Sequence, residues 1–238
     1  MTATFALART AAALVLLLAL AGARAQSPAA PRVLDSLAER TLPCTACHGA
    51  QGRASPAGYL PRIAGKPAGY LDNQLRAFRD GGREHSGMAH LLAPLSDAYL
   101  HEIAGHFAQL ELPYPPPEPP AAPPAVLARG EQLVRQGDPA RRLPACTSCH
   151  GAAMNGRLPA VPGLLGLPRD YLLGQLGAWG NGLRRAATPD CMAQVVQRLS
   201  ADDASAVASW LASQPVVRTM PEAAGGPAPP IDCGSGFR

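Results

Sequence analysis

Apolar residues recur along two segments of the chain at the spacing of an amphipathic helix. After Ser96 they stand three or four positions apart, at Leu100, Ile103, Phe107 and Leu110. After Ser200 a similar stripe comprises Val207, Trp210 and Leu211. This spacing gathers apolar side chains on one helix face, and each serine hydroxyl can accept from a free N–H in the first turn. The pattern therefore predicts a serine-capped helix in each half of the chain.

Two further pairs of segments favour helices. A middle helix is predicted over 70–79 in the first half and over 171–179 in the second. An opening helix is predicted over 33–40 and over 126–136. No run of alternating β-branched residues indicates a strand. We therefore expect an all-α fold built from two small domains.

A proline-rich segment separates the halves. Residues 113–125 read PYPPPEPPAAPPA. Proline fixes φ and lacks a backbone donor, so this stretch is expected to be a semi-rigid polyproline II linker. The predicted organisation is a signal peptide at 1–25, a first domain at 26–112, the linker at 113–125, a second domain at 126–214 and a Pro/Gly-rich tail at 215–238.

The halves also share landmarks at a nearly constant separation. Cys44 and Cys146 are 102 positions apart, and Met88 and Met192 are 104 apart. Between them, Tyr-Leu and Gln-Leu pairs recur at 70–75 and 171–176, and Leu-Ser pairs follow at 95–96 and 199–200. A separation held over several landmarks indicates an internal duplication.

The N-terminus has the pattern of a secretory signal. Arg9 precedes an unbroken apolar run over 11–21, and Ala23-Arg24-Ala25 matches a small-residue cleavage site. The run is shorter than the roughly 20 residues that span a bilayer, which disfavours the alternative of an uncleaved anchor. We expect cleavage after Ala25 and an exported protein without stable membrane insertion.

Composition adds two constraints. Aromatic residues are only 5% of the 238 residues, a small supply for two cores, so a buried cofactor would help to fill them. The formal net charge of +4 falls to +2 once Arg9 and Arg24 are removed. No basic stripe with interleaved aromatic residues is present, which argues against nucleic-acid binding.

Two Cys-x-x-Cys-His motifs carry the candidate chemistry. They comprise Cys44, Cys47 and His48 in the first half, and Cys146, Cys149 and His150 in the second. Two thiols at this spacing can each add to one vinyl group of a porphyrin, and the next residue, His, becomes the proximal iron ligand. The motifs therefore predict two covalently attached haem c groups. A shared Cys₄ zinc site, a redox dithiol or plain disulfides would leave the histidines or the repeated context unexplained.

Methionines are the candidates for the opposite axial ligand. Met88 and Met192 occupy equivalent repeat positions in surroundings predicted to be loop-like. Core packing is the alternative role for a methionine, and His85 or His90 could replace Met88 as a ligand of the first iron. Iron ligated by His and Met on its two sides has no position for oxygen or peroxide, which favours an electron carrier over a catalyst.

These residues resemble the dihaem cytochromes c of the cytochrome c-four type, in which each half is a class I cytochrome c domain. The resemblance covers residues 34 to about 214 and includes both Cys-x-x-Cys-His-Gly stretches, residues 61–67 and 70–81, both Met…Leu-Ser segments and residues 128–131. It implies tandem domains joined by the linker, with haems facing each other across the interface. It also implies a periplasmic carrier that delivers electrons to a terminal oxidase or another haem protein. Pro61 and Pro162 stand where such domains supply a carbonyl to the proximal His.

The chain departs from that pattern at two cysteines. Cys191 directly precedes Met192, and Cys233 lies in the additional tail. In an oxidising compartment two remaining cysteines suggest a disulfide, which would tie the tail over the second haem edge. Free thiols, or thiols bonded to another chain, remain the alternative.

The leading hypothesis for function is a diffusible, non-enzymatic dihaem carrier with redox proteins as partners. A cytochrome subunit of a periplasmic dehydrogenase would use the same haems with one fixed partner. A dihaem peroxidase would need one iron to lose Met88 or Met192, and a haem sensor would need an output domain.

Overall fold

The two serine-capped helices are present in the computed structural model, which describes residues 36–55, 58–120, 122–217, 220–225 and 227–235. Helix α6 spans Asp97–Ala108 and helix α11 spans Ala201–Ala212. The Ser96 hydroxyl accepts from the Tyr99 N–H at 3.3 Å, and the Ser200 hydroxyl accepts from the Asp203 N–H at 3.1 Å. These bonds satisfy first-turn donors that would otherwise lack an intrahelical partner, as the sequence predicts.

The middle helices are also present, and both begin two residues before their predicted start. Helix α4 spans Ala68–Arg79 and helix α9 spans Arg169–Gly180. Pro67 and Pro168 hold the N-cap positions, where a missing N–H removes no helical hydrogen bond. The chain can therefore enter the helix directly after each proline.

The opening helices differ from their predicted ranges. Helix α2 spans Leu37–Arg40, and residues 33–35 of the predicted helix lie outside the described residues. Helix α7 spans Pro124–Gln136, so residues 124 and 125, the last two of the predicted linker, belong to this helix. Proline is well suited to the first helical position because its φ is already helical, which explains why Pro124 starts the helix instead of extending the linker.

The remaining elements are short, and several lie close to the landmarks of the repeat. They are α3 (Leu42–His48), η1 (Ala50–Gly52), α5 (Ser86–Leu92), η2 (Pro139–Arg141), α8 (Thr147–His150), β1 (Gly156–Arg157), β2 (Val161–Pro162) and α10 (Cys191–Val196). Strands β1 and β2 pair antiparallel, with Gly156 opposite Pro162. They form the only sheet in the described part of the chain, and the fold is therefore all-α in character.

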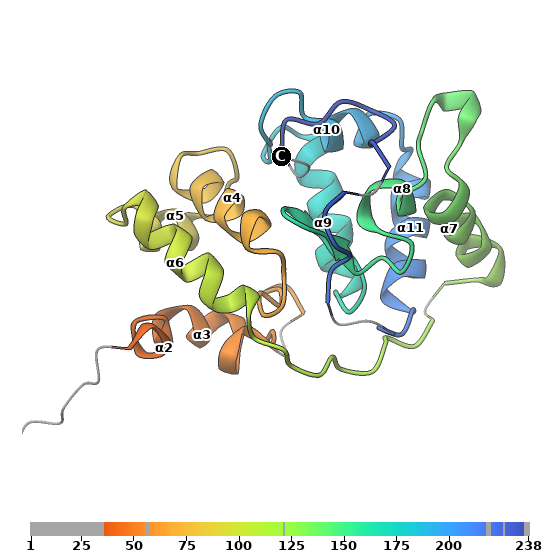
Figure 1. The fold of residues 1–238 in the computed structure, drawn as a ribbon. Coiled ribbons are helices and arrows are strands. Elements are labelled where there is room, and N and C mark those ends of the chain that lie inside the picture. Colours follow the sequence, from red (N-terminus) through yellow and green to blue (C-terminus); the bar gives the residue numbers. More distant parts are fainter. Residues whose placement is uncertain (1–35, 56–57, 121, 218–219, 226, 236–238) are drawn as a thin grey trace, which may run out of the picture. The chain divides into compact units, whose positions relative to one another are not determined.

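Two hydrophobic cores form, one from each half of the chain. Figure 1 labels the helices that contribute to them. In the first half α4 packs on α6, and the core centres on Leu71, Ile103, Ala104 and Phe107. In the second half α11 packs on α7 and α9, and the core includes Leu133, Val134, Leu172 and Leu211. Residues 36–238 belong to one compact unit, so the limits of the two domains remain a prediction.

A glycine sets the packing of α7 against α11, which lie side by side in Figure 1. A Cβ atom at Gly130 would lie 2.2 Å from the Ala206 carbonyl oxygen and 2.8 Å from the Trp210 Cβ. Only a residue without a side chain permits this approach. Gly130 therefore has a clear packing role in the second half.

The segment between the halves has neither helix nor strand from 110 to 120. It is nevertheless anchored at both ends. The Arg62 guanidinium donates to the carbonyls of Leu112 and Pro113, and the Glu118 N–H donates to the Ala212 carbonyl at 3.1 Å. No helix among the described residues is both long and apolar enough to cross a membrane.

We predict that Asp203→Asn weakens the second half of the chain at neutral pH. Asp203 is buried on α11, and it pairs with Arg129 at 2.9 Å and Arg141 at 2.7 Å. Burial alone would raise the pKa of Asp203, but the hydrogen bonds from the two arginines outweigh it and lower the pKa to about 2. The expected loss is about 1–2 kcal/mol of unfolding free energy at pH 7, after allowance for solvent screening.

Because the folded pKa lies below the unfolded one, this contribution is present above the unfolded pKa and is lost as the pH falls through about 2. Urea unfolding of the wild type and of Asp203→Asn across the acid range should therefore give converging midpoints at low pH. The exposed neighbour Asp202→Asn is the matched control. Equal midpoints for wild type and Asp203→Asn at pH 7 would contradict the prediction.

Candidate functional site

The first Cys-x-x-Cys-His motif lies on α3. Cys44 and Cys47 are three residues apart on one helix, so their side chains lie on neighbouring positions of the same face. His48 is buried and is the last residue of the helix, and Gly49 follows it with a φ of +75°. A Cβ at Gly49 would lie 2.0 Å from the Ala54 carbonyl oxygen, so the turn requires glycine. The helix end thus fixes the direction of the His48 ring.

The second motif has the same local geometry. Helix α8 contains Cys149 and ends at His150, and Cys146 is its N-cap residue. Gly151 follows His150 with a φ of +88°. None of the four motif cysteines is in a disulfide, and no group of three or more His, Cys, Asp or Glu in the described residues could hold a metal ion. Among the described residues, the four motif cysteines are thus neither paired with one another nor gathered in a group that could hold a metal ion.

Each proximal His candidate is oriented by a proline carbonyl. The Nδ1 atom of His48 lies 2.8 Å from the Pro61 carbonyl oxygen, and that of His150 lies 2.7 Å from the Pro162 oxygen. The expected hydrogen bonds are confirmed. A carbonyl can only accept, so Nδ1 carries the proton and Nε2 keeps its lone pair. Burial lowers the pKa of both histidines, which holds them in the neutral form that ligates iron.

The two candidate axial methionines lie on short helices rather than in loops, which corrects the sequence interpretation. Met88 is in α5, where the His85 side chain accepts from the Met88 N–H at 3.2 Å. Met192 is in α10, where the Asp190 carboxylate accepts from the Ala193 N–H at 2.9 Å. These capping residues support helices of seven and six residues, too short for periodicity to reveal.

Both sets of candidate residues line one cavity of about 880 Å³. Its walls include all eight members of the two sets: Cys44, Cys47, His48, Met88, Cys146, Cys149, His150 and Met192. His85 also lines it, whereas His90 is exposed and is not part of the wall. Burial raises the pKa of the Cys146 thiol to about 12. The sequence predicts two sites, and the structure connects them into a single space.

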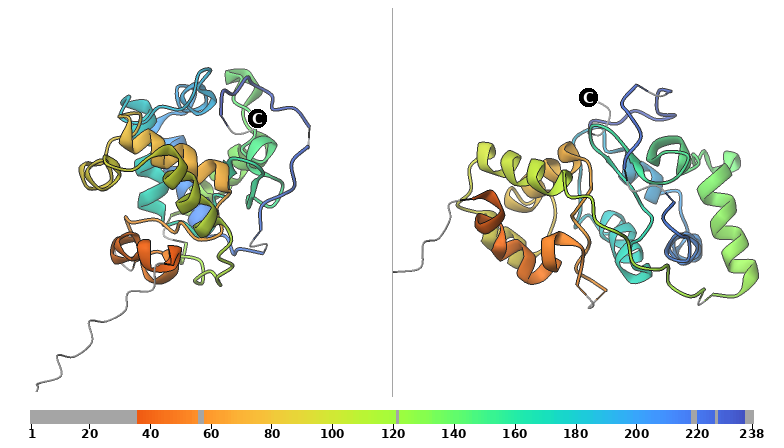
Figure 2. Two further views of the ribbon diagram at one scale, coloured as in Figure 1. Left: turned by 60° about the vertical axis from the view of Figure 1, so that its left-hand side comes forward. Right: turned by 60° about the horizontal axis from the view of Figure 1, so that its bottom comes forward.

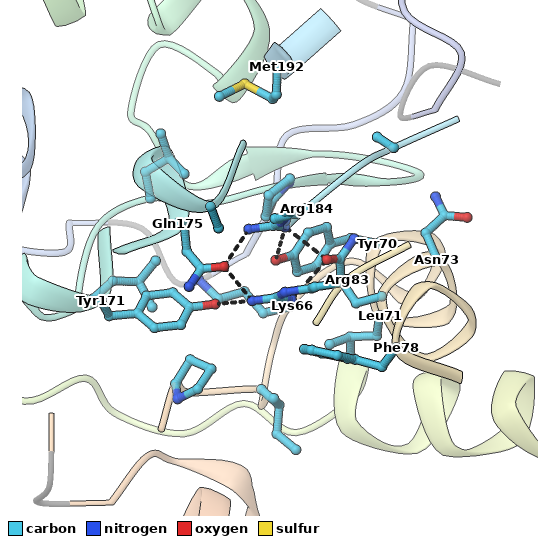
Figure 3. Close-up of a pocket in the computed structure, with 18 of the residues that line it drawn as sticks. Lys66, Tyr70, Leu71, Asn73, Phe78, Arg83, Tyr171, Gln175, Arg184 and Met192 are labelled. Atoms are coloured by element: carbon cyan, nitrogen blue, oxygen red, sulfur yellow. Dashed lines mark hydrogen bonds between the residues drawn. The ribbon is translucent and has the colours of Figure 1, made fainter. Parts of the chain in front are cut away.

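The two halves meet at this cavity through a pair of buried arginines (Figure 3). Arg83 donates to Gln74 of its own half and to Tyr171 and Gln175 of the other, at 2.9, 3.0 and 2.6 Å. Arg184 donates to Gln175 of its own half at 2.8 Å, and to Gln74 and Tyr70 of the other at 2.8 and 3.4 Å. The repeat therefore produces a network in which each arginine has equivalent partners.

Stacking and backbone bonds support the same network. The Arg83 guanidinium lies 4.4 Å from the Phe78 ring centroid, and that of Arg184 lies 3.8 Å from the Trp179 centroid. The Glu84 N–H donates to the Leu183 carbonyl at 2.9 Å, and the Arg185 N–H donates to the Gly82 carbonyl at 2.7 Å. The chain segments that carry the arginines thus form one antiparallel bridge between the halves.

The charges on this cavity wall fit a cofactor that carries carboxylates. Neither Arg83 nor Arg184 has a carboxylate partner among the described residues. Lys66 is buried nearby, where its ammonium donates to the Gly163 carbonyl at 2.9 Å and burial lowers its pKa to about 7. Buried cations usually require an anionic partner. The propionates of a haem are such anions, so the residues of this cavity fit that group.

Sequence reasoning missed these cations. It used the Tyr and Gln positions only as landmarks of the repeat, and it gave Arg83, Arg184 and Lys66 no role. A signal was available, because Arg83 and Arg184 are 101 positions apart and keep the register of Tyr70 with Tyr171. An arginine that occurs at the same position in both copies of a duplication is a candidate for binding a ligand common to both copies. It need not be only a solvated surface residue.

Relatives of known name show which family has this arrangement. The chain is 37% identical to the thiosulfate dehydrogenase electron acceptor of Thiomonas intermedia over 80% of this chain and 87% of that one. It is 36% identical to the cytochrome c4 of Pseudomonas aeruginosa over 71% of this chain and 82% of that one. The chain belongs to the cytochrome c4 family. No protein-family model matches the sequence.

Solved structures agree with this assignment. The reduced cytochrome c4 of Pseudomonas stutzeri matches with a TM-score of 0.64 and 32% identity, over 74% of this chain and 95% of that one. The thiosulfate dehydrogenase TsdBA of Marichromatium purpuratum matches with a TM-score of 0.65 and 34% identity over 73% of this chain. The cytochrome c4 homologue described here spans only 36% of that second protein.

Membership of the family supplies the cofactor and the general activity. This cytochrome c4 homologue carries two haem c groups and transfers electrons. The fold is that of tandem, mainly helical cytochrome c domains, as the resemblance implies. The two Cys-x-x-Cys-His segments and the cavity that they share are the candidate haem sites.

We expect that Cys44→Ser with Cys47→Ser yields a protein with one covalent haem, because the second motif is complete on its own. Cys146→Ser with Cys149→Ser should likewise retain one haem, attached through the first motif. The haem-to-protein ratio, measured by the pyridine haemochrome assay and by intact mass, should fall by half in each case. Loss of both haems from a protein that remains soluble and helical, or of neither, would contradict the assignment.

Proposed function

We propose that the protein is a periplasmic dihaem carrier whose irons are ligated by His48 with Met88 and by His150 with Met192. One observation supports this most directly: both His and Met pairs line the same cavity as the four motif cysteines. Haem c supplies a one-electron iron couple when it is bound. The chain supplies thioether attachment, neutral imidazoles fixed by Pro61 and Pro162, and cations for the propionates.

The ligand set proposed here supports a carrier rather than an enzyme. A protein ligand on each side of an iron leaves no position for oxygen or peroxide, and a Met ligand raises the reduction potential. A dihaem peroxidase would need one of these methionines to be displaced, and His85 is already engaged with the Met88 N–H.

Signal-peptide cleavage after Ala25 and export to the periplasm are part of the same proposal. Residues 1–35 lie outside the described residues, so the support comes from the sequence pattern. The oxidising environment of that compartment is compatible with the disulfide between Cys191 and Cys233. It is also the compartment in which redox proteins of the respiratory chain would be reached, including a terminal oxidase as the final acceptor.

Carbon monoxide tests the axial ligands. The visible spectrum of the reduced wild-type protein should not change when carbon monoxide is added, because both irons are closed. Met88→Ala and Met192→Ala should each open one site, and each variant should show about half of the change expected for two open haems. Met154→Leu is the control, because Met154 is buried in the second core and does not line the cavity. A wild-type protein that binds carbon monoxide would overturn the ligand assignment.

A second candidate function is the electron acceptor of a thiosulfate dehydrogenase. Two curated relatives bear that name, from Thiomonas intermedia at 37% identity and Stutzerimonas stutzeri at 35% identity. The structural match to TsdBA of Marichromatium purpuratum supports the same candidate. In this role the same two haems would serve one fixed partner instead of several.

The two candidates differ in donor specificity. We predict that the oxidised protein is reduced by thiosulfate only when the catalytic thiosulfate dehydrogenase of Thiomonas intermedia is added, with a rate proportional to enzyme concentration. Oxidase-containing bacterial membranes, supplied with air, should then reoxidise it. Reduction by the enzyme without reoxidation by the membranes would favour a fixed acceptor. Reoxidation by the membranes of a protein that this enzyme does not reduce would favour a general carrier. Failure of both reactions would exclude both roles.

A further inference from the structure

The two candidate haem sites differ in what covers them. The second half has a C-terminal segment, here defined as residues 220–225 and 227–235, that follows α11 and passes over that half (Figures 1 and 2). Its members Ile231, Cys233 and Ser235 form part of the cavity wall. In the described residues, no corresponding segment of the chain covers the first site.

The C-terminal segment is fixed beside Met192. Cys233 forms a disulfide with Cys191, the residue directly before Met192. The Gly234 N–H donates to the Pro189 carbonyl at 2.8 Å. A Cβ at Gly234 would lie 2.4 Å from the Thr188 carbonyl oxygen, so glycine is needed for this close approach. One end of the segment is thus held against the loop that leads into α10.

A second anchor lies beside the haem-attachment motif. The Glu222 carboxylate accepts from the Ala152 N–H at 2.8 Å, two residues after His150. The Glu222 backbone donates to the Gly156 carbonyl and accepts from the Leu158 N–H, both at 2.8 Å. A third contact joins Arg157 to the Pro227 carbonyl at 3.2 Å. The segment therefore connects the His150 side of the second site to its Met192 side.

The residues around the two motifs differ in exposure. Leu42, two residues before Cys44, is 60% exposed, whereas Leu143, three residues before Cys146, is 5% exposed and belongs to the second core. Cys47 is exposed, and its partner Cys149 is half-buried. Tyr59, at 58% exposure, also lines the cavity in the first half. The first site is thus more exposed along its attachment segment than the second, whose residues 144–149 are half-buried.

We infer that the C-terminal segment closes the second haem site to partner proteins, so that electrons enter and leave the molecule at the first site. The inference rests on the proposed carrier function and specifies its contact surface. The partner is a redox protein that brings its own cofactor edge to the apolar surface around Leu42 and Cys47. Electrons reach the second haem through the shared cavity, across the contact between the halves.

Ligand exchange tests the closure directly. Imidazole competes with methionine for ferric haem iron, and the absorption band of the Met–iron bond reports each displacement. In the wild-type protein this band should disappear in two phases of equal amplitude. The slower phase should have a rate at least about tenfold below that of the faster phase, because opening of a covered site limits access. Two indistinguishable phases would overturn the inference.

Variants of the C-terminal segment assign the slow phase. Cys191→Ser with Cys233→Ser should accelerate it at least about fivefold and leave the fast phase unchanged. Glu222→Ala keeps the disulfide and should give a smaller acceleration of the same phase, which protects the test if the double variant fails to fold. Asp232→Asn, an exposed neighbour of Cys233, is the control. Acceleration of the fast phase, or of neither, would show that the segment does not close the second site.

A protein probe tests the contact surface. Stopped-flow reduction by a soluble monohaem cytochrome c should be slowed about fivefold or more by Leu42→Glu, since charged residues are disfavoured at the centre of an interface. Leu158→Glu adds the same charge to an exposed leucine of the second half and should have little effect. Equal slowing by both variants, or slowing by Leu158→Glu alone, would overturn the inference. If the probe reduced neither the wild type nor any variant, the carrier function itself would fail.

Discussion

Arg83 and Arg184 are buried where the two halves of the chain meet, and each has hydrogen-bond acceptors in both halves. Desolvating a guanidinium is costly unless its donors are satisfied, and amide and phenol oxygens satisfy the donors without neutralising the charge. The halves must therefore stay in register for either arginine to be stable. The same constraint keeps two haem-binding sets on one cavity and leaves positive charge where the propionates would bind.

Much of this arrangement could be predicted from the sequence because the informative patterns are local. The Cys-x-x-Cys-His spacing, the serine caps at Ser96 and Ser200, and the helical periodicity each depend on a few neighbouring residues. Because the sequence is duplicated, each of these patterns occurs twice in the chain. The short helices around Met88 and Met192 were missed because their stability comes from caps such as His85 and Asp190, in helices of only two turns.

The contact between the halves could not be predicted in the same way. It depends on pairs about 90 to 110 positions apart, such as Arg83 with Gln175 and Arg184 with Gln74. Burial of an arginine or of Lys66 is a property of the assembled fold, since each of these residues would be solvated in the isolated segment. The sequence offered one indication of a common role for the two arginines. Their separation along the chain equals that of Tyr70 and Tyr171.

The six cysteines of the chain also constrain how the protein matures. In an oxidising compartment six free thiols permit many alternative disulfide pairings, and most of them would consume a haem-binding thiol. Once four thiols are committed to haem, Cys191 and Cys233 are left as the single pair that can form. Their positions on α10 and in the C-terminal segment mean that this pairing also requires the second half to be folded around Met192. Haem attachment would therefore ensure that Cys191 pairs with Cys233. In a chain without haem, either cysteine could instead form a disulfide with a cysteine of the haem-attachment motifs.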